Sequence, residues 1–311
     1  MDFKTTLQKS PFIITEGGTD ERIHREFNIK LNPYIHGAGL IYDSEGQAVL
    51  TKIFKQYADI GRDYNLPMFL ATPTARANPE RIKKSGFAAK NVNRDCFQFM
   101  DALRQTYGEY SNKVFVGGSM ASKGDSYKPK EALPGDEALS FHLSQVEELT
   151  RAGVDFLIGY TLPAVSEALG MAKAMSTCDT PYILSFVVRP EGTLLDGTAL
   201  KEAIALIDSE VSPNPLGYMI NCVHPTIFES AITSEINSSS FVRKRVLGLQ
   251  ANTSSKSPEE LDGSAELHTE EPSVTAQLMA RLYHRFGLKI LGGCCGTDNR
   301  HIRSMVDILI S

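Results

Sequence analysis

Eight short apolar segments with the character of buried strands alternate along the chain with segments of helical periodicity. The expected strands are residues 12–15, 68–71, 114–116, 154–158, 182–188, 217–221, 245–249 and 288–291. Alternating strands and helices imply parallel strands joined by right-handed crossovers. Eight such units in 311 residues, with no linker between them, predict an α/β chain that folds as one (β/α)8 TIM barrel over residues 1–311.

An open, doubly wound parallel sheet is the structural alternative. Its phosphate-binding G-x-G-x-x-G turn is absent, because the first expected strand is followed by Glu16-Gly17-Gly18. The barrel is therefore favoured. Ser44 and Gln47 resemble a capping box at the start of a helix, whereas residues 19–42 and 252–271 are expected to be mainly loop. The other helices are expected at about residues 95–107, 136–152, 198–207, 225–233, 272–286 and 298–310, with one more that starts after Pro163.

The composition excludes several classes of partner. A formal net charge of −5 and a pI near 5.9 argue against a nucleic-acid or anionic-membrane surface, which needs concentrated Lys and Arg. No window approaches the ~20 apolar residues of a membrane span, and residues 1–10 do not form a signal peptide. We therefore expect a cytoplasmic protein with small-molecule partners, neither nucleic acid nor membrane, and leave its oligomeric state open.

Polar side chains gather at one end of the predicted barrel, which is the end that carries the active site in this fold. They follow the strands as Glu16-Gly17-Gly18, Thr72, Ser119, Tyr160, Arg189, Asn221-Cys222, residues 252–254 and Cys294-Cys295.

Three of the five cysteines stand at these strand ends. Cys222 follows the sixth strand, and Cys294 and Cys295 follow the eighth, between glycines that permit a sharp bend. Three soft thiolates favour zinc and leave a fourth position for water or substrate. The alternatives are two buried small hydrophobic residues or a disulfide between Cys294 and Cys295. Cys96 and Cys178 are interpreted as packed thiols, and no disulfide framework is expected.

An all-thiolate zinc site favours chemistry at sulfur. A substrate thiol in the fourth position would lose its proton and stay nucleophilic, which fits alkyl transfer better than hydrolysis. His224, two residues after Cys222, is either a fourth ligand or the start of the next helix, and the helix start is favoured. Glu16 is either a solvated carboxylate or a partner for a substrate ammonium group.

The chain resembles the homocysteine S-methyltransferase family, zinc-dependent (β/α)8 barrels, over nearly its whole length. The resemblance rests on Gly292-Gly293-Cys294-Cys295-Gly296-Thr297 and Asn221-Cys222-Val223-His224-Pro225, which look like the family's zinc-ligand motifs. It implies methyl transfer to zinc-bound homocysteine, giving methionine. It further implies that Cys222, Cys294 and Cys295 are metal ligands and catalytic, and that the substrate site contains Glu16, Gly17, Gly18, Thr72, Ser119, Tyr160 and Asn221.

Two positions depart from the family pattern. Glu16 replaces the usual aspartate, and Tyr160 replaces a glutamate expected to bind the homocysteine amino group. These changes leave open a different thiol acceptor, a non-catalytic zinc- or redox-sensing barrel, and Tyr160 itself as a phenolate ligand of zinc. Because betaine enzymes favour aromatic cages and this chain has no Trp, a sulfonium donor, S-methylmethionine or S-adenosylmethionine, is expected.

Overall fold

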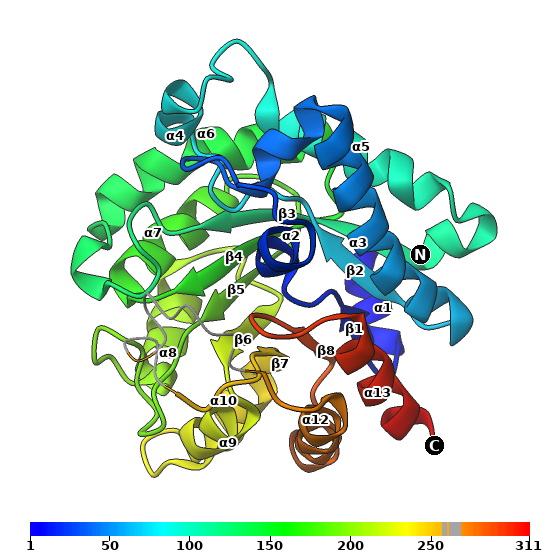
Figure 1. Cartoon of the computed structure of the whole chain (residues 1–311). Coiled ribbons are helices and arrows are strands. Elements are labelled where there is room, and N and C mark those ends of the chain that lie inside the picture. The colour runs from blue at the N-terminus through cyan, green and yellow to red at the C-terminus, as the bar shows by residue number, and fades with distance from the viewer. Residues whose placement is uncertain (257–259, 261–268) are drawn as a thin grey trace.

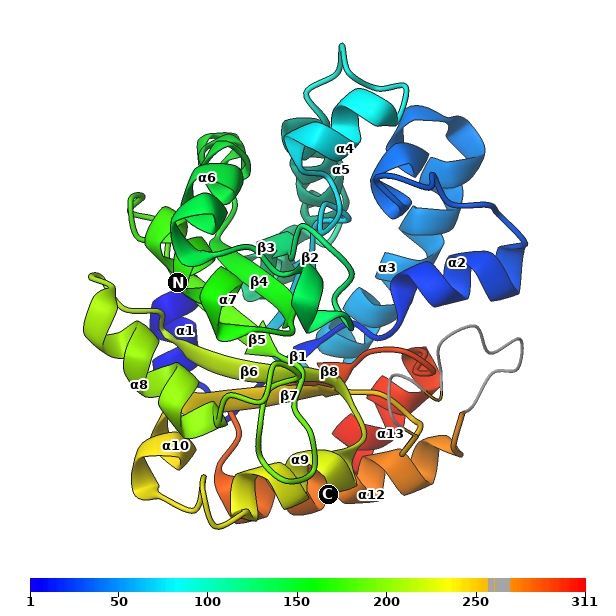
Figure 2. The same ribbon diagram turned by 90° about the vertical axis from the view of Figure 1, so that its left-hand side faces the viewer.

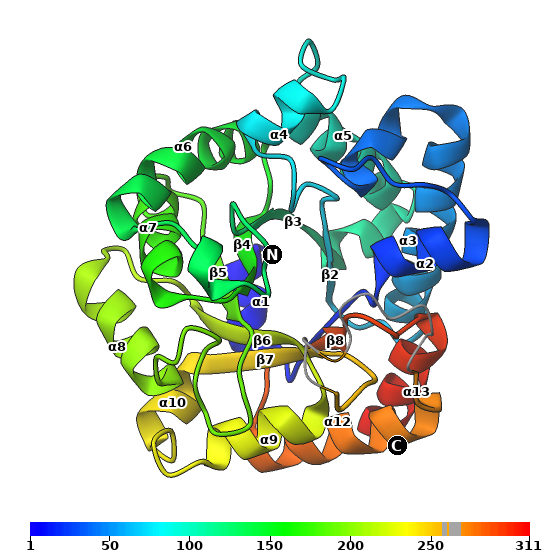
Figure 3. The same cartoon turned by 60° about the vertical axis from the view of Figure 1, so that its left-hand side comes forward.

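The computed structural model is a closed barrel of eight parallel strands in sequence order, with β1 pairing with β8 to close it. It describes residues 1–256, 260 and 269–311. The helices surround the strands as an outer layer (Figure 3). The predicted fold class is confirmed. The strands are β1 (Ile13–Thr15), β2 (Met68–Ala71), β3 (Val114–Ala121), β4 (Phe156–Leu162), β5 (Tyr182–Phe186), β6 (Gly217–Val223), β7 (Val246–Ala251) and β8 (Ile290–Gly293).

The helices bury apolar faces against the barrel (Figure 1). They are α1 (Phe3–Lys9), α2 (Thr19–Phe27), α3 (Ser44–Asp63), α4 (Pro79–Lys84), α5 (Val92–Gln105), α6 (Gly135–Ala152), α7 (Val165–Met175), α8 (Leu200–Glu210), α9 (Pro225–Thr233), α10 (Ser240–Arg245), α12 (Pro272–Phe286) and α13 (Asn299–Ile310), with 3-10 turns η1 (Gly37–Tyr42), η2 (Gly108–Lys113) and η3 (Pro129–Glu131).

Two ends of the barrel differ in what covers them. Helix α1 lies at the amino-terminal ends of the strands, and α2 lies at the opposite end (Figure 2). The ring of Phe3 in α1 stacks on Phe156 with centroids 3.9 Å apart, and it also contacts Phe69 and Phe115 edge-on. These rings belong to a compact cluster inside the barrel, so the α1 end is plugged and the carboxyl ends of the strands are left for function.

Several strands are longer than the sequence indicated, which corrects the placement of the polar residues. Ser119 and Tyr160 lie within β3 and β4 rather than after them, and β6 continues past the expected end at Asn221 to Val223. The reason in β3 is that its glycines are packing residues and not turn residues. A Cβ on Gly117 would come within 2.7 Å of the Phe156 ring, so glycine makes room for an aromatic residue of the next strand.

Helix starts were also shifted. The N-cap of α3 is Asp43, whose side chain accepts a hydrogen bond from the amide of Gly46, so Ser44 is the first helical residue and not the cap. The short helices α1, α4 and α10 were not predicted, because six or seven residues show too little periodicity. Of the predicted 252–271 loop, residues 257–259 and 261–268 lie outside the described residues.

Across the described residues, no helix is both long enough and apolar enough to span a membrane.

Candidate metal and substrate site

The three cysteines predicted from the strand ends converge at the carboxyl end of the barrel. The Sγ atoms of Cys222, Cys294 and Cys295 all lie within 4.8 Å of one another. Cys222 comes from β6, and the other two follow β8. Cys222 and Cys295 have an Sγ–Sγ distance of 3.9 Å. The chain therefore brings three sulfur atoms to one point, as expected from the strand order.

An irregularity in β6 sets the position of the Cys222 sulfur. Cys222 has a φ of 55°, in the left-handed region, and the pairing of β6 with β7 shifts register between Asn221 and Val223. A non-glycine residue in this region is strained and typically marks a functional position. The shift lets Cys222 leave the normal alternation of side chains along the strand.

The turn that carries Cys294 and Cys295 is held by two neighbouring strands. The amide of Cys294 donates to the carbonyl of Ala251, and the amide of Thr253 donates to the carbonyl of Cys295. On the other side, the turn after β1 packs so closely that a Cβ on Gly18 would lie 2.7 Å from the Cys294 carbonyl oxygen. Gly18 therefore has an evident packing role in positioning the cysteine turn.

The geometry of the cluster fits a zinc ion. Tetrahedral zinc with Zn–S bonds of about 2.3 Å separates its sulfur ligands by about 3.8 Å. The distance between the sulfurs of Cys222 and Cys295 is 3.9 Å, close to that value. Three thiolates are soft ligands that favour zinc over hard cations, so the donor set and this spacing both fit the metal.

One sulfur pair differs from the expectation of reduced thiols. Cys222 and Cys294, 72 residues apart in sequence, form a disulfide, whereas Cys295 is free. The sequence raised a disulfide only between the adjacent cysteines Cys294 and Cys295, so the pair that is bonded differs from that alternative. The convergence of β6 and β8 is the cause, because the same proximity that suits a metal also suits oxidation. A three-thiolate site forms only when this bond is reduced.

His224 caps a helix, as favoured from the sequence. It is the N-cap residue of α9, and its Nδ1 accepts a hydrogen bond from the amide of Thr226. Its Nε2 lies 3.1 Å from a carboxylate oxygen of Glu270. Both ring nitrogens are thus engaged, which argues against His224 as a fourth ligand and gives it a role in fixing the end of β6.

A second group, of buried acceptors at or just after the first, fourth and seventh strands, has no cationic partner among the described residues. The carboxylate of Glu16 accepts the amide of Ala71 with both oxygens at 3.1 Å, and no Lys, Arg or His of the described segments pairs with it. The hydroxyl of Tyr160 and the Oε1 of Gln250 are also buried without a hydrogen-bond partner. Gln250 is oriented by its Nε2, which donates to the hydroxyl of Thr15 at 3.0 Å.

Burial changes the acidity of two of these groups. Desolvation raises the pKa of Glu16 from 4.5 to about 8. Desolvation also raises the pKa of Tyr160 well above its ordinary value, and the negative charge of Glu16 adds to this effect. The Tyr160 hydroxyl therefore stays protonated, which disfavours the phenolate ligand that the sequence raised.

The remaining predicted residues are tied to each other. The Ser119 hydroxyl donates to the Thr72 carbonyl at 2.5 Å, and the Ser119 amide donates to the Thr72 hydroxyl at 3.0 Å. The amide oxygen of Asn221 accepts from the Thr161 amide and from the Ser185 hydroxyl, which braces β6 against β4 and β5. A substrate role for these residues, and for Gly17, stays a prediction.

The raised pKa of Glu16 predicts a pH-dependent stability. Between about pH 4.5 and 8 the unfolded chain has lost this proton and the folded chain keeps it. The free energy of unfolding therefore falls as pH rises, by roughly 1 kcal/mol per pH unit from this group. Urea unfolding at several pH values should show the wild type losing stability relative to Glu16→Gln across this window. A constant difference between the two proteins would contradict the assignment.

The fold and the sulfur cluster define a (β/α)8 barrel with a candidate metal centre at its active-site end. Residues 13–309 match the family model for homocysteine S-methyltransferase. The chain belongs to this family of methyltransferase enzymes, which confirms the resemblance seen in the sequence.

Several relatives are distant in sequence but cover nearly the whole chain. Homocysteine S-methyltransferase YbgG of Bacillus subtilis is 21% identical over 310 residues, which are 96% of this chain and 95% of the relative. Two crystal structures of the homocysteine methyltransferase MmuM from Escherichia coli superpose with a TM-score of 0.77. The oxidized form is 19% identical and the metallated form 18%, with 97% and 98% of both chains covered. At these identities the structures show a shared fold.

Proposed function

We propose that this protein transfers a methyl group from a sulfonium donor to the thiol of homocysteine and forms methionine, with zinc held by Cys222, Cys294 and Cys295. The observation that carries the proposal is the convergence of the three sulfurs within 4.8 Å at the barrel mouth. Zinc at this position would favour loss of the acceptor's thiol proton at neutral pH.

The transfer balances without a further reactant. The acceptor thiol releases its proton to solvent, and its sulfur attacks the methyl carbon of the donor. The new sulfur–carbon bond forms as the donor's sulfur–methyl bond breaks, and the donor leaves as a neutral thioether. The protein's part is to align the two sulfur atoms, which needs separate binding contacts for acceptor and donor.

Three buried acceptors support an amino acid as the thiol acceptor. A primary ammonium group has three N–H donors. The Tyr160 hydroxyl and the Gln250 Oε1 are buried without a hydrogen-bond partner, and the Glu16 carboxylate accepts the Ala71 amide but has no cationic partner among the described residues. Buried acceptors without partners cost free energy until a ligand satisfies them. The charge of the ammonium would also stabilise the ionised form of Glu16. The acceptor that is lost when Tyr160 replaces a glutamate is thus supplied by the Oε1 of Gln250.

Acidic groups near the cluster support a cationic donor. Glu21 of α2 accepts a hydrogen bond from the amide of Gly296, the residue after Cys295. Burial is the main cause that raises the pKa of the Cys295 thiol. The negative charges of Glu21 and Asp20 raise it further. Negative charge beside the site attracts a sulfonium ion, and the absence of Trp removes the best aromatic partner for betaine.

The experiment is an assay of the reduced, zinc-loaded protein with homocysteine and one donor at a time. S-methylmethionine or S-adenosylmethionine should yield methionine, and betaine should not. Methylation by betaine alone would overturn the choice of donor. No methionine from any donor would overturn the activity itself.

The disulfide gives a second candidate, a barrel that senses redox state or zinc without catalysis. It is favoured by the bond between Cys222 and Cys294, which removes two of the three metal ligands when it forms. One zinc bound per reduced chain, together with no turnover of any thiol acceptor, would select this function over methyl transfer.

A further inference from the structure

Two residues just before α12 connect the two turns that carry the cysteine cluster. The hydroxyl of Thr269 donates to the carbonyl of Gly296 at 3.0 Å, and Gly296 directly follows Cys295. The carboxylate of Glu270 lies 3.1 Å from Nε2 of His224, which is two residues beyond the cysteine of β6. One dipeptide therefore contacts both the β6 turn and the β8 turn.

The contact between Glu270 and His224 has a defined direction. The Nδ1 of His224 accepts a hydrogen bond from the amide of Thr226 at 3.3 Å. An Nδ1 that accepts leaves the proton of the neutral ring on Nε2, which donates it to the Glu270 carboxylate. A hydrogen bond to a carboxylate is stronger than one between neutral groups. Because His224 is the N-cap of α9, Glu270 restrains the start of that helix and the end of β6.

The Thr269–Glu270 segment is itself attached to the β8 side of the site. The Nε2 of His301, in the first turn of α13, lies 3.1 Å from the main-chain carbonyl oxygen of Glu270 and donates to it, since a carbonyl only accepts. His301 is buried. Together with the bond from Thr269 to Gly296, this gives two attachments on the β8 side and one, through His224, on the β6 side.

The end of β7 provides the other connection between the two turns. The carbonyl of Ala251 accepts from the amide of Cys294, and the side-chain amide of Asn252 donates to the carbonyl of Cys222 at 3.2 Å. A turn that is attached at two places has less freedom to reorient its side chains than a turn attached at one. The Thr269–Glu270 segment thus adds a second restraint on the sulfur positions.

We propose that Thr269 and Glu270 are positioning residues of the metal centre, which hold the β6 and β8 turns at the spacing that lets three sulfurs bind one ion. The inference rests on the proposed zinc site and adds two residues that are not among its ligands. Groups that orient metal ligands typically contribute 10–100-fold to metal affinity.

The first test is the zinc affinity of the reduced full chain, measured by competition with a chelator. Glu270→Ala should lower the affinity about tenfold. Glu270→Gln keeps an oxygen acceptor for His224 and should lose less. The matched control is Glu271→Ala, which changes the net charge equally, because Glu271 is exposed and its side chain does not cap α12. An equal loss in Glu270→Ala and Glu271→Ala, or no loss in Glu270→Ala, would overturn the proposal.

The hydroxyl of Thr269 is tested by a pair of substitutions. Thr269→Val removes the hydroxyl at nearly constant volume and should lower zinc affinity about threefold, the effect of one neutral hydrogen bond. Thr269→Ser keeps the hydroxyl and should bind zinc like the wild type. Equal affinities of these two variants would overturn the assignment of Thr269.

A second readout needs no metal and no methyl transfer. The disulfide between Cys222 and Cys294 is equilibrated with glutathione, where two glutathione thiols become one glutathione disulfide as the protein bond becomes two thiols. Weaker restraint lowers the effective concentration of one thiol at the other, so Glu270→Ala should be half-reduced at about threefold less glutathione. An unchanged midpoint would overturn the proposal. No zinc binding by the wild type would instead overturn the zinc site, while the midpoint still tests the positioning role.

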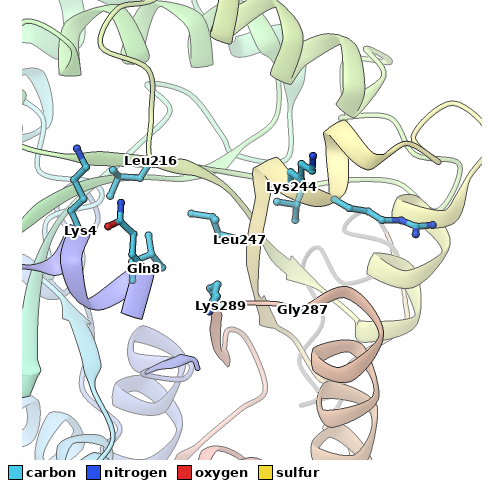
Figure 4. A pocket seen from close by; sticks show the side chains of 10 residues that line it. Lys4, Gln8, Leu216, Lys244, Leu247, Gly287 and Lys289 are labelled. Carbon is cyan, nitrogen blue, oxygen red and sulfur yellow. The ribbon is translucent and has the colours of Figure 1, made fainter. Parts of the chain in front are cut away.

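A remote control comes from the other end of the barrel. A cleft of about 350 Å³ lies there, and Gln8 of α1 and Leu247 at the start of β7 are on its walls (Figure 4). Gln8→Ala should change neither the zinc affinity nor the glutathione midpoint. Changes as large as those of Glu270→Ala would show a general effect on the fold and would overturn the proposal.

Discussion

Cys222→Ser, Cys294→Ser and Cys295→Ser should each lower zinc affinity of the reduced protein by more than about 100-fold. Removing a residue that only orients a metal ligand typically lowers metal affinity 10–100-fold. Removing the ligand itself should therefore have a larger effect. Methyl transfer should fall with the zinc content. The measurement is zinc per chain after dialysis against a chelator of graded strength, with methionine formation assayed on the same samples.

The barrel should stay folded in these variants, because the three sulfurs lie at the mouth and not in the packed interior. Circular dichroism and thermal unfolding check this. Cys178→Ser is the matched control, since Cys178 is a free, half-buried thiol outside the cluster. If any one of the three variants keeps full zinc affinity, that cysteine is not a ligand.

Glu16→Gln should reduce kcat/KM for homocysteine by about 10- to 150-fold, because a hydrogen bond to a charged group contributes about 1.5–3 kcal/mol. The same variant should leave the methylation of 4-mercaptobutyrate nearly unchanged, since that thiol lacks the amino group. The comparison is made at and above pH 8, where the Glu16 carboxyl loses its proton. The two acceptors differ only in the group that Glu16 is proposed to bind.

Tyr160→Phe should have a smaller effect than Glu16→Gln on kcat/KM for homocysteine. It removes one neutral acceptor and keeps the buried ring, so the loss for homocysteine should be smaller, about fivefold. An equal loss on both acceptors in Glu16→Gln would show that Glu16 supports the shape of the site and does not bind an ammonium group.

Much of the architecture could be predicted from alternation alone. Strands buried on both faces are short apolar runs, and eight of them in this length fit one closed barrel. The strand lengths could not be predicted, because Gly117 and Gly118 look like a turn in sequence. In the barrel they make room for Phe156 and its neighbours, which only the packing of β3 against β4 reveals.

The site also has features that the sequence predicts and features that only the tertiary structure reveals. Cys222, Cys294 and Cys295 could be predicted to converge because two strand ends of one barrel face the same mouth. The register shift at Cys222 and the disulfide to Cys294 depend on tertiary geometry that carries no local signal. Gln250 was missed, although a lone polar residue near the end of the apolar strand β7 was a usable sign. Thr72 follows β2 as expected, whereas Ser119 lies inside β3, and the polar groups of the two residues bond to one another.

The central claim is that the three cysteines of the barrel mouth form one zinc site in the reduced protein. The most direct measurement is zinc bound per chain while the Cys222–Cys294 disulfide is reduced stepwise. We predict one zinc per fully reduced chain and a proportional loss of zinc as the disulfide forms. No zinc in the reduced protein, or full zinc retention with the disulfide intact, would contradict the claim.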